Sequence, residues 1–215
     1  MVIMRKKDLE LILERIPEYL DRPSESLEQY VTPASIAADI LWIAFMNGDV
    51  KGKVVADLGT GSGRLAIGAS ILGAKHVVGI DLDTRHVIRL KKLGVDEDIR
   101  QYIEVIDFIQ ADVKELSIRC DTVIQNPPFG VYRRGADTEF LITAFKISNV
   151  VYSLHKSVEE SRQYLIKLAN YYGFKAELIK TYRFPIKAML NKHRKRIHYV
   201  DVDLFMYVRT EGKFK

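Results

Sequence analysis

The sequence is poor in cysteine and in long apolar runs, and both shortages limit what the chain can be. Its single cysteine, Cys120, excludes an internal disulfide and any metal site built from several cysteines. No apolar run approaches the length of a membrane span, and residues 1–15 form a charged helical pattern without the apolar core of a signal peptide. We therefore expect a cytoplasmic protein without a metal site.

Linkers, repeats and low-complexity segments are also missing, which favours a simple domain organisation. The 215 residues are 47% hydrophobic and 28% charged, as in a soluble globular protein with a sizeable core. We expect one domain at residues 27–215, preceded by a helical extension at residues 1–26.

Short apolar runs alternate with helical patterns along the chain. Strands are predicted at residues 53–57, 76–80, 102–109, 121–125, 149–154, 174–182 and 199–208. Helices are predicted at residues 7–16, 33–47, 64–72, 137–147 and 158–172, with a further one opened by Thr84. Thr32 is expected to be the N-cap of the second helix, with Pro33 at its first position. This order predicts an α/β fold with a mainly parallel sheet covered by helices on both faces.

A glycine-rich loop follows the first predicted strand. Gly59, Gly61 and Gly63 would let the backbone approach a ligand closely at the N-terminus of a helix. The spacing differs from the dinucleotide pattern, because Gly63 comes one residue early. Asp57, two residues before Gly59, would meet the positive end of the loop or a cationic ligand.

Two further acids lie at the ends of the next two predicted strands. Asp81 is placed to accept hydrogen bonds from the two hydroxyls of a ribose, and Asp112 is within reach of an adenine amine. Either acid alone could be a solvated strand-end residue. Together with Asp57 they favour a sulfonium amino acid attached to a nucleoside over a diphosphate.

The fourth predicted strand leads into Asn-Pro-Pro-Phe-Gly at residues 126–130. Two prolines fix the backbone and remove two donors, so the carbonyls there can accept. Asn126 adds a neutral side-chain oxygen, and Phe129 adds a flat apolar face. Rigid acceptors beside an aromatic ring suit a planar base with an exocyclic amine, although a polar turn at a strand end is the simpler alternative.

Positive charge is concentrated in one stretch of the chain. Seven lysines and arginines and no acid lie between Leu178 and Val200, whereas acids slightly outnumber bases elsewhere. Such a stretch favours a polyanion as partner, and a solvated basic loop is the alternative.

These motifs together resemble a class I S-adenosylmethionine-dependent amino-methyltransferase. The segments at residues 27–30, 126–130 and 151–156, with the basic stretch that closes at residues 202–204, resemble the methyltransferase-like protein five family. That family methylates the N6 amine of an adenine in small-subunit ribosomal RNA. The resemblance spans nearly the whole chain from about Leu27 onward.

The resemblance implies a class I methyltransferase Rossmann-like fold with a mostly parallel seven-stranded sheet, and S-adenosyl-L-methionine as cofactor. It implies that catalysis uses Asn126, Pro127, Pro128 and Phe129. The residues implied to bind the cofactor are Gln29, Thr32, Asp57, Gly59, Gly61, Gly63, Asp81, Asp112, Val113 and Asn126. Ribosomal RNA is the expected partner, bound by Lys192, Arg194, Lys195 and Arg196.

Three other functions stay open at this point. The motif at residues 126–129 also serves N6-adenine DNA methyltransferases and protein glutamine methyltransferases. The basic stretch disfavours a glutamine substrate, and the lack of a separate target-recognition domain disfavours sequence-specific DNA modification. A non-catalytic RNA-binding assembly factor would not need the complete motif.

A protein partner is also expected. In the strand order that the resemblance implies, the strand at residues 103–109 lies at one edge of the sheet, and it is apolar and lacks proline. Relatives in the resembled family are covered at this edge by a small zinc-binding methyltransferase activator protein. We expect a heterodimer formed by strand addition there, unless the N-terminal helix of the chain covers the edge itself.

Overall fold

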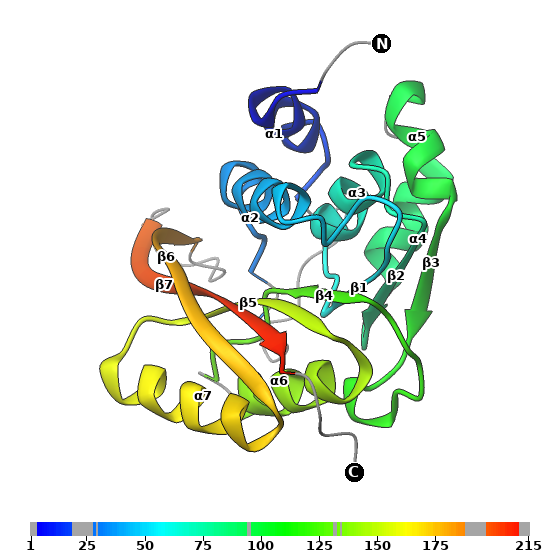
Figure 1. Cartoon of the computed structure of the whole chain (residues 1–215). Helices are drawn as coiled ribbons and strands as arrows, with labels where there is room; N and C mark the ends of the chain where they lie inside the picture. The colour runs from blue at the N-terminus through cyan, green and yellow to red at the C-terminus, as the bar shows by residue number, and fades with distance from the viewer. Residues whose placement is uncertain are drawn as a thin grey trace.

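Strands and helices alternate along the chain, as the sequence pattern predicts (Figure 1). The computed structural model describes residues 4–18, 28, 30–93, 96–130, 133, 135–187 and 197–210. The strands are β1 (Val54–Leu58), β2 (His76–Asp81), β3 (Ile106–Gln110), β4 (Thr122–Gln125), β5 (Val150–Lys156), β6 (Phe174–Lys187) and β7 (Ile197–Arg209). The helices are α1 (Lys6–Glu14), α2 (Ala34–Met46), α3 (Arg64–Ile71), α4 (Arg85–Leu93), α5 (Glu97–Glu104), the short 3-10 helix η2 (Val113–Glu115), α6 (Ala136–Ile147) and α7 (Glu159–Tyr171).

The seven strands form one sheet in the order β3-β2-β1-β4-β5-β7-β6. The pairs from β3 to β5 are parallel, and β7 pairs antiparallel with both β5 and β6. From β1 the chain proceeds outward to β2 and β3, then returns to place β4 on the other side of β1. The strand order therefore reverses between β1 and β4, and ligands of open parallel sheets bind at the carboxyl ends of strands at such a point.

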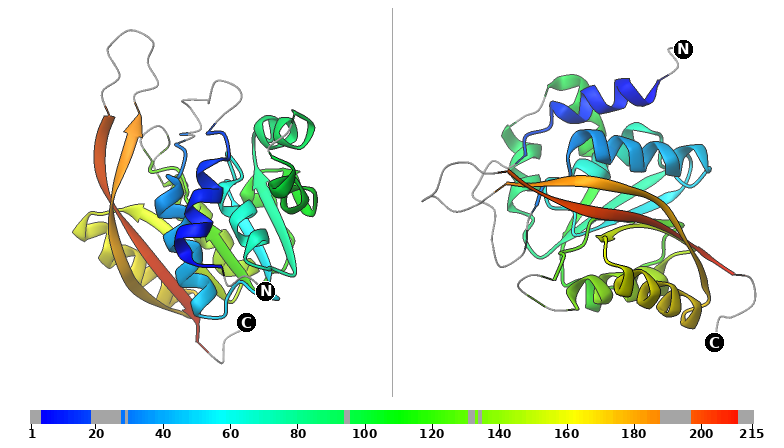
Figure 2. Two further views of the ribbon diagram at one scale, coloured as in Figure 1. Left: turned by 90° about the horizontal axis from the view of Figure 1, so that it is seen from above. Right: turned by 90° about the vertical axis from the view of Figure 1, so that its left-hand side faces the viewer.

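Each face of the sheet is covered by its own helices. On one face, apolar side chains of α1, α2 and α3 pack with inward residues of the sheet such as Val55 and Ile124. On the other face, α6 and α7 pack on Ala56, Val123 and Val151. Figure 2 shows these layers from two further sides. The predicted fold, an α/β sandwich around a mostly parallel seven-stranded sheet, is confirmed.

The N-terminal helix α1 belongs to one of these layers. Leu9, Leu13 and Ile16 are at most 1% exposed and lie in the same core cluster as α2 and α3. Helix α1 packs against α2 and α3, at a distance from β3 in Figure 1. The alternative in which α1 covers the edge at β3 is therefore not supported, and the division into residues 1–26 and 27–215 stays a prediction.

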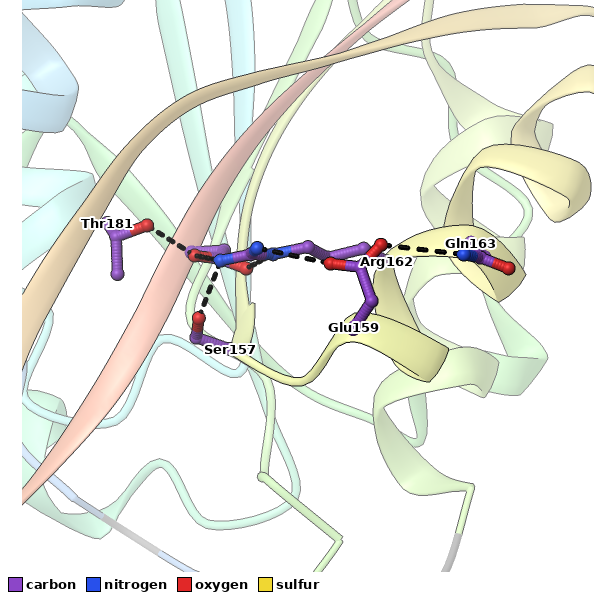
Figure 3. A network of polar contacts seen from close by, with 6 residues as sticks. Ser157, Glu159, Arg162, Gln163 and Thr181 are labelled. Atoms are coloured by element: carbon purple, nitrogen blue, oxygen red, sulfur yellow. Dashed lines mark hydrogen bonds and ion pairs between the residues drawn. The ribbon is translucent and has the colours of Figure 1, made fainter.

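Buried acids hold the long β6–β7 hairpin from both faces. On one face Asp203 of β7, with no exposed surface, accepts hydrogen bonds from Arg162 Nε of α7 and from Thr181 Oγ1 of β6, both at 2.6 Å (Figure 3). On the other face, Lys180 Nζ donates to Asp39 Oδ2 of α2 at 2.6 Å. These bonds offset the cost of burying each carboxylate. These contacts tie the hairpin to α7 on one face of the sheet and to α2 on the other, while the end of β6 and the start of β7 extend beyond the other strands (Figure 2).

Two predicted elements differ from those observed. The third strand was predicted at residues 102–109, but residues 102–104 belong to α5 and β3 begins at Ile106. Ile99 and Ile103, four residues apart, are both buried, so the helical period prevails there over the strand preference of single residues. The edge strand predicted at residues 103–109 is therefore shorter and ends at Gln110.

The basic stretch is also less of a loop than predicted. Strand β6 runs to Lys187 and not to Tyr182, and β7 begins at Ile197. Pro185 did not end the strand, because β6 is an edge strand in which a missing backbone donor is tolerated. Thr32 is likewise not a helix N-cap: Pro33 takes that position and Ala34 begins α2.

Candidate active site

A cavity opens at the carboxyl ends of the parallel strands, next to the point where the strand order reverses. Its wall contains the glycine loop after β1, the end of β2, the segments after β3 and β4, and the start of α6. Among the residues predicted to form the site, those on the wall are Thr32, Gly59, Gly61, Asp81, Asp112, Val113, Asn126 and Pro128. Segments far apart in the sequence are thus brought together because parallel strands end at the same edge of the sheet.

The glycine loop adopts a backbone that only glycine accepts without strain. Gly59 has φ 72°, and a Cβ there would lie 2.9 Å from the Phe140 ring on α6. Gly63, at φ 77°, is the N-cap of α3 and packs against Val87, where an added Cβ would come within 3.1 Å. The loop therefore needs glycine both for its conformation and for the close approach of α6 and α4.

The Asp57 carboxylate fixes the glycine loop through two hydrogen bonds. Its Oδ2 accepts hydrogen bonds from Thr60 Oγ1 at 2.8 Å and from the Ala66 backbone N–H at 3.0 Å. The side chain is almost completely buried, and burial raises the pKa of the Asp57 carboxyl to about 7. Within the described residues, the cavity wall does not include Asp57, so its contacts are those of a residue that shapes the loop.

Asp81 and Asp112 present carboxylates to the cavity. Asp81, at the end of β2, accepts from the Gly61 N–H at 2.8 Å and from the Asp83 N–H at 2.9 Å, and burial raises its pKa. Asp112, just beyond β3, accepts from the Lys114 N–H at 3.0 Å. Both carboxylates are oriented by backbone donors, and each oxygen has a second lone pair for a further donor.

Asn126 lies between β4 and the cavity with its amide in a defined orientation. Its Nδ2 donates to Thr32 Oγ1 at 3.0 Å. Its Oδ1 is buried and has no hydrogen-bond partner among the described residues. Because a buried oxygen without a partner is costly, such an atom on a cavity wall points to a ligand donor.

Phe129 is packed among aromatic rings on the side of the sheet that faces α2. Its ring is 6.3 Å from that of Tyr30, at an angle of 17°, and meets Phe184 of β6 edge-on at 5.7 Å. Within the described residues, the wall of the cavity includes Tyr30 but neither Phe129 nor Pro127. The motif at residues 126–129 therefore contacts the cavity at Asn126 and Pro128 and the β6–β7 hairpin at Phe129.

Comparisons with known proteins agree with this arrangement. The family model for ribosomal protein L11 methyltransferase (PrmA) matches residues 40–126, which include the glycine loop and end at Asn126. The crystal structure of a Pyrococcus horikoshii protein assigned as a candidate RNA methyltransferase superposes with a TM-score of 0.86 and 37% identity, covering 97% of this chain and 99% of that one.

Relatives in animals match over nearly their whole length. The rRNA N(6)-adenosine-methyltransferase METTL5 of Danio rerio is 35% identical over 214 residues, covering 96% of this chain and 100% of the relative. Mettl5 of Drosophila melanogaster is 34% identical, covering 92% and 96%. The chain belongs to the METTL5 family. It is therefore a methyltransferase of the class I fold, and S-adenosylmethionine is its methyl donor.

The residues of this METTL5-family chain suit that cofactor. The glycine loop lines the cavity with backbone that a ligand can approach closely, and Asp81 and Asp112 on the same wall supply acceptors for hydroxyl and amine groups. Magnesium protoporphyrin IX methyltransferase from Synechocystis, solved with bound SAH, shares the fold at a TM-score of 0.59 and 16% identity. The role of each single residue stays a prediction.

Some residues of the site were not anticipated, and others lie outside the described residues. Tyr30, Arg64, Arg133, Glu139 and Phe140 are on the cavity wall. Tyr30 belongs to the segment at residues 27–30 that carries the resemblance, and Arg64 directly follows the glycine loop, whereas α6 carries no motif. Gln29 and the predicted RNA-binding residues lie outside the described residues: Lys192, Arg194, Lys195 and Arg196.

Proposed function

We propose that this chain transfers a methyl group from S-adenosylmethionine to the N6 amine of an adenine in RNA, and that small-subunit ribosomal RNA is its substrate. The names of the METTL5 relatives support an rRNA adenosine as target. The observation that carries the proposal is the buried Oδ1 of Asn126, which has no partner in the described part of the chain. A ribosomal substrate also supports the prediction of a cytoplasmic protein.

The chemistry of an aromatic amine explains why such an oxygen is needed. The lone pair of the N6 amine is delocalised into the adenine ring, so the amine is a poor nucleophile. A hydrogen bond from the amine to Asn126 Oδ1, and a second to the Pro127 carbonyl, would favour a pyramidal nitrogen whose lone pair faces the methyl donor. Catalysis then comes from positioning and from preorganised acceptors, without a strong general base.

Phe129 is proposed to stack on the target base. Base–aromatic stacking contributes about 1–3 kcal/mol per base, and Phe129 is held in place by Tyr30 and Phe184. The base has to be unpaired or extruded from its stack to reach such a site. The positive charge of residues 192–196, which lie outside the described residues, supports RNA backbone binding by this segment.

We also infer that a small zinc-binding activator protein pairs with β3. Strand β3 lies at the edge of the sheet, and apolar side chains are exposed on and beside it: Val105 at 63% and Ile109 at 39%. Asp107 is exposed as well, with its Oδ2 3.1 Å from His76 Nε2, which protects the edge only in part. Main-chain bonds would give affinity and the exposed side chains selectivity.

The test of the catalytic proposal is Asn126→Ala. Loss of the acceptor is expected to lower methyl transfer to RNA about 100-fold or more, while the affinity for S-adenosylmethionine measured by calorimetry changes little. Thermal unfolding of the variant controls for loss of structure. An equal loss of cofactor binding would mean that Asn126 only shapes the turn, and full activity would contradict the proposal.

A further inference from the structure

The end of β5, at residues 151–156, carries part of the family resemblance but has no place in the proposed reaction. We propose that His155 of this strand is a positioning residue for methyl transfer: with Asp137 it holds the first turn of α6, and so the cavity wall that this turn forms. The inference goes beyond the proposed function. Its kinetic test rests on that function, because RNA is the methyl acceptor used.

His155 is buried among aromatic rings. It is 2% exposed, and its ring meets those of Phe205 and Tyr207 edge-on, each at 6.3 Å. Neither ring nitrogen has a hydrogen-bond partner within the described residues. An apolar side chain would fill this position at a lower cost, because burying polar atoms without partners is unfavourable. The imidazole therefore points to a role for its nitrogens beyond packing.

Two carboxylates lie beside this ring. Asp203, the cross-strand neighbour of His155 on β7, already accepts hydrogen bonds from Arg162 and Thr181. Asp137 Oδ2 lies 3.9 Å from His155 Nδ1. At this distance the interaction is electrostatic, and burial of the ring limits its screening by water. Asp137 is therefore the partner through which His155 acts.

The chemistry of the pair decides which nitrogen carries a proton. Burial raises the pKa of the Asp137 carboxyl, but His155 and backbone N–H groups at the start of α6 lower it, and the resulting pKa lies below the ordinary value. The carboxylate is thus ionised at neutral pH, and an ionised carboxylate accepts but cannot donate. The nitrogen that faces it, Nδ1, is therefore protonated.

The pair joins the strand beside the motif to the helix that follows the motif. Gln125 of β4 pairs with Ser153 of β5, so His155, two residues further on, lies level with the motif at residues 126–129. Asp137 is the second residue of α6. The end of β5 and the start of α6 are thus held together next to the residues proposed to bind the target amine.

The first turn of α6 also forms part of the cavity wall. Ala136, Glu139 and Phe140 lie on this wall. Phe140 packs so closely on the glycine loop that a Cβ at Gly59 would lie 2.9 Å from its ring. A shift of this turn therefore changes the wall and the glycine loop together. Because a misplacement of about 1 Å can lower a rate about 100-fold, the His155–Asp137 contact should affect kcat.

The kinetic test uses two substitutions for which packing and positioning predict opposite results. His155→Phe keeps a ring and loses the nitrogens, whereas His155→Asn is smaller but can place an amide N–H where Nδ1 lies. We expect kcat for RNA methylation to fall about tenfold or more in His155→Phe and to stay within about threefold of wild type in His155→Asn. In urea unfolding, His155→Phe should be the more stable of the two, because Asn leaves a cavity.

The reverse order of activities, with His155→Phe active and His155→Asn impaired, would show a packing role and overturn the inference. Equal losses in both variants would also contradict it. Wild-type protein that methylates no RNA would instead count against the proposed function.

A double-mutant cycle shows whether His155 acts through Asp137. Asp137→Asn keeps the shape of the side chain and removes its charge, and it should lower kcat about as much as His155→Phe. Combining the two should lower kcat no further than either alone, because each removes the same contact. Additive losses would mean that the two residues act separately.

A substrate-free measurement tests the pair whatever the substrate is. Two-bond ¹H–¹⁵N correlation spectra of ¹⁵N-labelled protein report which ring nitrogen of His155 carries a proton, with the signals assigned by their absence in His155→Phe. We expect a proton on Nδ1 in wild type and a shift of these signals in Asp137→Asn. A ring protonated on Nε2 alone, or signals unchanged by Asp137→Asn, would overturn the inference.

Discussion

At the scale of single residues, the site depends on polar groups placed where water is excluded. Asp57 is 1% exposed, with two hydrogen bonds on Oδ2 and no partner for Oδ1 among the described residues. Burial has the largest effect on the pKa of the Asp57 carboxyl and raises it to about 7. Near neutral pH the carboxyl is therefore only partly ionised, which costs less than a full charge in this position.

This shift predicts a pH dependence of stability. The folded-state pKa of Asp57, about 7, lies above its ordinary value of 3.8. The stability that the neutral carboxyl contributes is thus fully present below about pH 4 and is lost as the pH rises to about 7, by roughly 3–5 kcal/mol.

Asp57→Asn is expected to remove most of this loss in urea unfolding of the cofactor-free protein. Part of the decrease in unfolding free energy with rising pH should remain, because burial also raises the pKa of Asp81. The measurement is the free energy of unfolding of both proteins across that pH range. Parallel curves would show that Asp57 ionises at its ordinary pKa.

The sequence predicts the acids and the asparagine of the site better than its other residues. Asp81, Asp112 and Asn126 follow recognisable strands, so the rule that parallel strands end together is enough to bring them to one cavity. Phe140 of α6 also reaches the wall, where its ring lies against the position of Gly59, and no motif in the sequence marks it. Asp57 and Phe129 were predicted to meet ligands, and these assignments stay predictions.

At the scale of elements, the edge strand is the feature most open to test. Ile106 is fully buried, so substitutions there would probe the core and not the edge. Val105 and Ile109 are exposed, at 63% and 39%, and can be changed with little effect on packing. We expect Val105→Glu with Ile109→Glu to abolish co-purification with a co-expressed zinc-binding activator, since the charges oppose burial of the edge.

The chain offers a matched control at the other edge of the sheet. Leu178 of β6 is 42% exposed, and Leu178→Glu should leave co-purification unchanged. Retained pairing in the double variant would contradict partner binding at β3. A wild-type monomer that is stable and fully active alone would also contradict it.

Elements were predicted well where their period was clear and poorly where two signals competed. The apolar helix α2 and the alternating strand β7 were recognised from their patterns. Helix α5 was missed, because its β-branched and aromatic residues run directly into β3. The far half of β6 was missed, because a proline and clustered charge are typical of a loop, yet an edge strand tolerates both.

At the scale of the whole molecule, the fold brings three separate parts of the chain to one place. The segment before α2 supplies Thr32, the loop after β1 supplies the glycines, and the loop after β4 supplies Asn126. The hairpin, anchored by Asp203 and Asp39, contacts Phe129 through Phe184 of β6. No helix within the described residues is long and apolar enough to cross a membrane.

The central claim is that this molecule methylates the N6 amine of an adenine in ribosomal RNA. The most direct measurement is incubation with labelled S-adenosylmethionine and small-subunit ribosomal RNA from cells that lack this protein, followed by nucleoside analysis. DNA and glutamine-containing peptides serve as competing substrates, and the Asn126→Ala variant as a blank. The account predicts that the label appears in RNA as N6-methyladenosine and is absent with the variant. Label in another nucleoside, in DNA or in peptide glutamine instead would contradict it.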